Sequence, residues 1–118
     1  MTEYFVKLRY YPGDALEEIK EGVLKTLARK YRVQISYEKI ENRQIKEGLL
    51  MESTLDKRIE EITQEVITVS GDREGKFSDC IRALYKRYRC PRTAYSLLGS
   101  NEAGEKIAKG LMNIHGGW

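Results

Sequence analysis

Five basic side chains alternate with three tyrosines between Ile81 and Tyr95, in the segment IRALYKRYRCPRTAY. Lysine and arginine can neutralise phosphates, and an aromatic ring can stack on a nucleobase. The residue types in this segment therefore point to the binding of RNA or DNA. The candidate binding residues are Arg82, Lys86, Arg87, Arg89, Arg92 and Tyr95.

The spacing within this segment also indicates a helix. At about 100° per residue, Ile81, Leu84 and the tyrosines at 85 and 88 share one face, while Arg82, Lys86 and Arg89 form a neighbouring stripe. We therefore predict that two of the three tyrosines belong to the core and that the cations are exposed. An exposed row of cations is also typical of an ordinary solvated helix face.

A second basic surface is expected on the first predicted strand. Tyr4, Val6, Leu8 and Tyr10 alternate with Phe5, Lys7 and Arg9, which is the period of two of a strand. If the first set packs beneath helices, Lys7 and Arg9 are exposed beside Phe5 and add a secondary nucleic-acid surface. The alternative is that Phe5 packs against the C-terminal helices or a second subunit, because an open sheet face needs a cover.

The elements that must position these residues can be predicted from the pattern of the chain. Pro12 and Gly13 end the first strand, and a capping box at Asp14 and Glu17 favours a helix that continues to Tyr31. Further strands are expected over 33–37, 45–51 and 66–70, with a helix over 55–62. The basic helix follows from Ser78 to Pro91, and a last helix spans about 101–114.

The order β-α-β-β-α-β, over about residues 3–70, predicts an α+β fold of the ferredoxin-like sandwich type. The two later helices form a C-terminal extension of that sandwich. A length of 118 residues, of which 41% are hydrophobic, predicts one domain spanning 1–118.

Charge and composition narrow the function classes. The net charge is +3, and residues 67–118 carry nine Lys and Arg against five Asp and Glu, so the excess positive charge lies in the C-terminal part. The charged fraction of 33% resembles that of thermophile proteins. The sequence contains no apolar run long enough to span a membrane and no signal-peptide pattern, which predicts a soluble cytoplasmic protein.

Catalytic and metal-binding patterns are scarce. Cys80, Cys90 and His115 are too few for a disulfide framework or a four-ligand zinc site, and no Walker, GxGxxG or GxSxG motif is present. Cys90 lies in a basic setting that could lower its thiol pKa, but no base accompanies it, and an idle thiol is the alternative. We therefore expect no cofactor, no metal and no catalytic residue.

These observations favour a non-enzymatic nucleic-acid-binding protein whose basic helix contacts phosphates, with RNA and DNA both open. A homodimer is expected, because pairing through the sheet would cover its open face. One alternative is a structural or regulatory module that dimerises through its sheet and docks an acidic protein on the basic helix. A second alternative is a small enzyme with a site between subunits.

Overall fold

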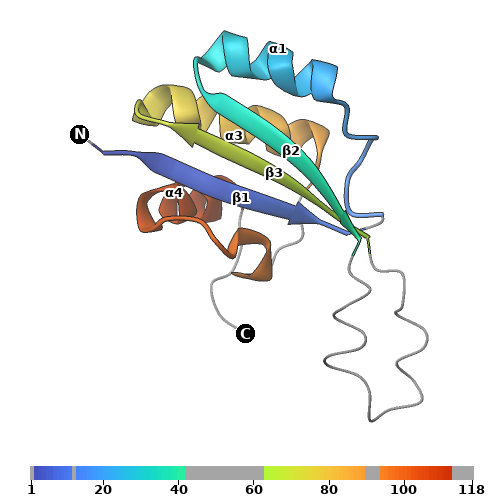
Figure 1. Ribbon diagram of the computed structural model, residues 1–118. Helices are drawn as coiled ribbons and strands as arrows, with labels where there is room; N and C mark the ends of the chain where they lie inside the picture. The colour runs from blue at the N-terminus through green and yellow to red at the C-terminus, as the bar shows by residue number, and fades with distance from the viewer. Residues whose placement is uncertain (1, 12, 42–62, 90–93, 113–118) are drawn as a thin grey trace.

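The computed structural model describes residues 2–11, 13–41, 63–89 and 94–112 (Figure 1). These residues form an α+β fold with one three-stranded antiparallel sheet and three α-helices. In chain order the elements are β1 (Tyr4–Tyr10), α1 (Glu21–Tyr31), β2 (Gln34–Glu41), β3 (Thr63–Gly71), α3 (Glu74–Arg87), the 3₁₀ helix η2 (Ala94–Leu97) and α4 (Glu102–Met112).

Strand β3 lies between β1 and β2 and is antiparallel to both. The register aligns Val6 with Val69 and Val69 with Ile35, so these three apolar residues share one face of the sheet. The strands predicted near 4–10, 33–37 and 66–70 are confirmed, with longer ends for the last two. The predicted strand 45–51 and helix 55–62 lie outside the described residues, and the ferredoxin-like order is not confirmed.

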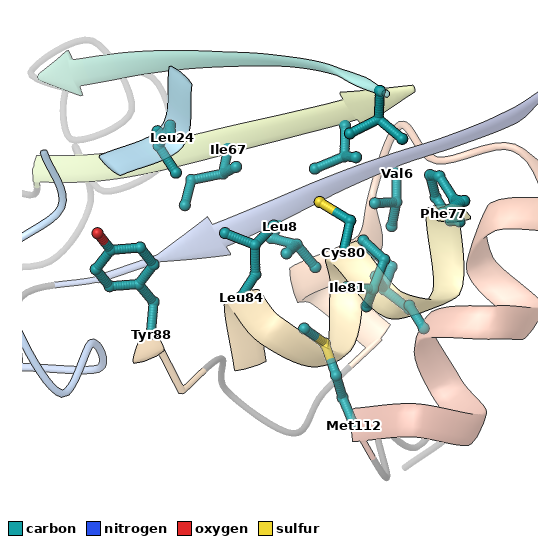
Figure 2. Packing of buried hydrophobic residues seen from close by; sticks show 14 of the residues in the cluster. Val6, Leu8, Leu24, Ile67, Phe77, Cys80, Ile81, Leu84, Tyr88 and Met112 are labelled. Carbon is teal, nitrogen blue, oxygen red and sulfur yellow. The ribbon is translucent and has the colours of Figure 1, made fainter. Parts of the chain in front are cut away.

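All three helices contribute to a core on one face of the sheet. Figure 2 shows α3 side chains pointing toward Val6 and Leu8 of β1 and Ile67 of β3, while Leu24 reaches the same layer from α1. Figure 1 shows α1 beside β2, α3 behind the sheet and α4 beneath β1. The fully buried side chains of this core include Val6, Leu8, Tyr10, Ile67, Val69, Phe77, Cys80, Ile81, Leu84, Tyr88 and Met112.

The outer edge of β1 is closed by Asn101, the residue that precedes α4. Its side-chain oxygen accepts hydrogen bonds from the backbone N–H of Phe5 (3.1 Å) and of Gly104 (2.8 Å), so one side chain caps the helix and satisfies the strand. Its amide nitrogen donates to the Glu3 carbonyl, and the Ser100 hydroxyl accepts from Lys7 N–H. These contacts replace a neighbouring strand and protect the edge from pairing with other chains.

Gly104 allows α4 to pack directly on the β1 backbone. A β-carbon at this position would overlap the Phe5 carbonyl and lie 2.9 Å from the Phe5 nitrogen. Helical spacing predicts Ala103, Ile107, Leu111 and Met112 as the inward residues of this helix. In the structure Met112 is buried as predicted, together with Gly104 and Ala108, whereas Ala103, Ile107 and Leu111 are half-buried. The helix is therefore rotated toward its small residues, because only these permit the close approach.

Three helix boundaries differ from the sequence predictions. Helix α1 begins at Glu21 instead of near Asp14, because the Asp14 carboxylate accepts a hydrogen bond from Tyr11 N–H (2.8 Å) and closes a turn after β1. Helix α3 begins at Glu74, before the predicted cap at Ser78. It ends at Arg87, before the predicted stop at Pro91, because the next carbonyl, that of Tyr88, turns to accept from the Tyr10 hydroxyl (2.9 Å).

No helix among the described residues has both the length and the apolar character that a membrane crossing requires.

The close contact between α4 and β1 gives a stability prediction. Gly104→Ala should lower the free energy of unfolding by about 1–3 kcal/mol, because the added methyl group meets backbone that cannot rotate away. Gly110→Ala is the matched control on the same helix: no atom lies within 4 Å of its added β-carbon, so it should stabilise by about 0.5–1 kcal/mol. Urea unfolding of both variants measures the difference, and equal effects would mean that α4 does not pack as described.

Candidate nucleic-acid interface

Helix α3 presents its basic residues on the side away from the core. Phe77, Ile81 and Leu84 are fully buried, and this leaves Arg82 and Lys86 exposed on the outer side of the helix. Arg89 is also exposed, just beyond the last residue of the helix. We refer to Arg82, Lys86 and Arg89 as the basic stripe.

The predicted inward face of α3 is confirmed for most of its residues. Ile81, Leu84 and Tyr88 are fully buried, whereas Tyr85 is half-buried. Cys80 is on the same buried side, and loss of solvation raises the pKa of its thiol to about 12. A thiol with such a pKa is not a nucleophile at neutral pH.

Arg82 has an acidic neighbour on its own helix. Its Nη1 atom lies 3.2 Å from Oδ1 of Asp79, one turn earlier, and both side chains are about half exposed, at 54% each. Exposed ion pairs of this kind contribute roughly 0–1 kcal/mol. A phosphate can therefore replace Asp79 as the partner of Arg82 at little cost.

Arg87 lies apart from the basic stripe and has an acidic partner from another segment. Its guanidinium pairs with the Glu17 carboxylate, in the segment that precedes α1. The hydrogen bond and charge of Glu17 raise the pKa of Arg87. Arg87 thus connects the end of α3 to the start of the α1 region, and a phosphate would have to compete with Glu17 for it.

A groove of about 360 Å³ lies beside the basic stripe, between α3 and the end of α1. The residues that line it are Tyr31, Asp79, Arg82, Ala83 and Lys86. Positions 79, 82, 83 and 86 recur at helical spacing, so they share one side of α3.

The end of α1, whose last residue Tyr31 lines this groove, also carries positive charge. Arg29 and Lys30 occupy the last turn of the helix, and Lys30 Nζ is 5.4 Å from the centre of the Tyr31 ring. Arg32 adopts a left-handed conformation (φ 53°) that ends the helix, and Val33 N–H donates to the Ala28 carbonyl.

Sequence reasoning missed Tyr31 as a site residue, because its helical spacing marked only the end of an apolar face. Its neighbours Arg29, Lys30 and Arg32 were the signal that could have identified it, since they surround an aromatic residue with cations.

Lys7 and Arg9 lie on the opposite face of the sheet from the core helices. The alternating burial along β1 confirms their predicted orientation, with both side chains half-buried. Arg9 donates from Nε and Nη2 to the Leu98 carbonyl (3.2 and 2.7 Å) and from Nη1 to Gln64 (3.3 Å). It therefore holds the turn after η2 onto the sheet. Because the sheet separates them, Lys7 and Arg9 do not share a surface with the basic stripe.

The remaining candidate residues lie outside the described side chains. Arg92, Cys90 and His115 lie outside the described residues, and for Tyr95 the structure describes the backbone of η2 but not the side chain. Within the described ranges, no three His, Cys, Asp or Glu side chains gather closely enough to hold a metal ion.

Comparisons of the chain with protein-family models, with curated proteins and with solved structures found no match.

Proposed function

We propose that this protein is a non-enzymatic nucleic-acid-binding protein that contacts phosphates through the basic stripe. The observation that carries the proposal is the exposure of Arg82 and Lys86 on one outer side of α3, next to a groove with an aromatic wall. Arg89 follows within a few residues and is also exposed. Phosphate contacts from such cations supply sequence-independent affinity.

The charge distribution supports a polyanion as the partner. Residues 67–118 carry a formal charge of +4, from nine basic and five acidic residues, whereas the preceding residues sum to −1. A polyanion is therefore attracted to the part of the chain that contains α3. Arg87 and Arg92 are proposed as additional phosphate contacts and Tyr95 as an additional ring.

The proposal does not depend on Lys7 and Arg9. These residues face the other side of the sheet, and Arg9 already serves to fix the turn at Leu98. If they bind nucleic acid, they form a separate surface. A long strand bound to the basic stripe would have to pass around the domain to contact it.

Charge reversal of the basic stripe tests the proposal. Arg82→Glu, Lys86→Glu and Arg89→Glu together should abolish binding of labelled single-stranded and duplex RNA and DNA in a gel shift. Folding should change little, since exposed substitutions usually alter stability by about 0.5 kcal/mol or less each.

A second triple variant controls for net charge. Lys20→Glu, Lys39→Glu and Lys106→Glu change exposed residues on other elements, and both triple variants shift the net charge from +3 to −3, by two units per residue. The control variant should keep most of its binding. Equal losses in both variants, or full binding by the stripe variant, would remove the basic stripe from the proposal.

A second candidate function is a module that dimerises through its sheet and docks an acidic protein on α3. The observation that favours it is the outer edge of β2, which pairs with no strand among the described residues. An edge strand presents unpaired backbone groups that a second copy could satisfy. The face of β2 that points away from the helices is polar, because it exposes Gln34, Ser36 and Glu38.

Mass measurement tests the homodimer. Light scattering after size-exclusion chromatography at micromolar concentration should give about twice the 13.7 kDa of one chain. A dimer would also double the basic stripe and strengthen attachment to a long polyanion. A mass near 13.7 kDa would show that one copy suffices and would leave a single basic surface.

A further inference from the structure

The groove between α1 and α3 has a shape that the basic stripe alone does not explain. Ala83 is the short side chain among longer ones on that side of α3, with Asp79 one turn before it and Lys86 about one turn after it. The helix surface is therefore recessed at Ala83. Tyr31, half-buried at the last position of α1, forms the opposite wall.

The charges around this recess favour an anionic ligand with a planar, apolar part. Arg82 and Lys86 line it from α3, and Lys30 Nζ lies over the Tyr31 ring, so a base that stacks on this face of the ring takes the place of the Lys30 ammonium. Among the described residues, Asp79 is the one acidic residue that lines the groove, and it is paired with Arg82. A nucleotide combines the two properties, since its phosphate is anionic and its base has a π-face that stacks on aromatic rings.

We propose that this groove receives an unstacked base of single-stranded RNA or DNA against Tyr31, while Arg82 and Lys86 hold the neighbouring phosphates. This inference rests on the proposed function and specifies its ligand. A base within a duplex is stacked between its neighbours and cannot enter a recess between two helices unless it is first extruded. The groove therefore selects single strands, and its preference follows from the ring and not from the cations.

Substitutions at Tyr31 separate the ring from the rest of the groove. Tyr31→Phe keeps the ring and should bind a labelled oligo(dT) or oligo(U) as the wild type does. Tyr31→Leu fills much of the same space without a π-face and should weaken this binding roughly 5- to 150-fold, the range expected for the loss of one stacked base. Binding of a duplex of equal length should change less than twofold.

Three controls accompany these variants. Thermal melting checks that Tyr31→Leu is folded, because Tyr31 also packs against the core. Tyr4→Leu removes a half-buried tyrosine that packs on Phe77, away from the groove, and should leave the affinity unchanged. Poly-glutamate at equal total charge should displace the oligonucleotide weakly, since it has charges but no bases.

A fluorescence measurement reports on stacking directly. Tyr31→Trp in a Trp118→Phe background places a single tryptophan in the groove, because the chain contains only one. Addition of oligo(dT) should quench its emission, and addition of poly-glutamate should not.

The outcomes distinguish this inference from the proposed function. Three results together would show that the base-binding groove is wrong while the proposed function stands. The wild type would bind single strands and duplexes alike, Tyr31→Leu would have no effect, and reversal of the basic stripe would still abolish binding. If poly-glutamate competes as well as the oligonucleotide, base recognition is also wrong. If the folded wild type binds no nucleic acid at low salt, the proposed function itself fails.

Discussion

Burial of one face of α3 is the constraint on which the rest of the structure depends. Each fully buried large apolar side chain contributes about 1.5–3 kcal/mol, and Phe77, Ile81 and Leu84 all belong to the buried cluster that includes residues of β1 and β3 (Figure 2). A rotation of the helix would expose these residues and move Arg82 and Lys86 toward the core, where unpaired charges are costly. The orientation of the basic stripe is therefore fixed by the core, whether or not a ligand is bound.

Strand β1 fixes the position of α4 and the point at which α3 ends. At its start, the Phe5 backbone binds Asn101 and contacts Gly104, which brings α4 against the open edge of the sheet. At its end, the Tyr10 hydroxyl takes the Tyr88 carbonyl out of the helical pattern. Arg89 consequently follows the helix instead of continuing it, so the basic stripe consists of two helical cations and one cation in the chain beyond.

Local patterns predicted the elements better than their ends. The alternation along Tyr4–Tyr10 and the apolar spacing of α3 depend on period alone, and both are confirmed. Asp14 satisfied the rule for a helix cap, but its carboxylate serves a turn after β1, because a cap and a turn use the same side-chain acceptor. The order of the strands depends on long-range pairing, which no local pattern encodes, and β3 occupies the centre of the observed sheet.

For the candidate site, the sequence predicted which α3 residues are exposed and could not predict their surroundings. The exposure of Arg82 and Lys86 follows from helical period, and the structure agrees. The pairing of Arg87 with Glu17 and the position of Tyr31 beside Ala83 join residues far apart in the chain, so they required the tertiary structure. Lys7 and Arg9 were predicted as a secondary nucleic-acid surface, and the sheet separates them from α3.

The salt dependence of wild-type binding tests the central claim most directly. Three phosphate contacts by Arg82, Lys86 and Arg89 on a single strand should release about 0.7 counterion each, about two in all, so log K for a single-stranded oligonucleotide should fall with log salt at a slope of about −2. Titrations between low and physiological salt measure this slope. A slope near −2 agrees with attachment through the basic stripe, whereas an absence of binding at low salt, or binding that salt does not weaken, would contradict it.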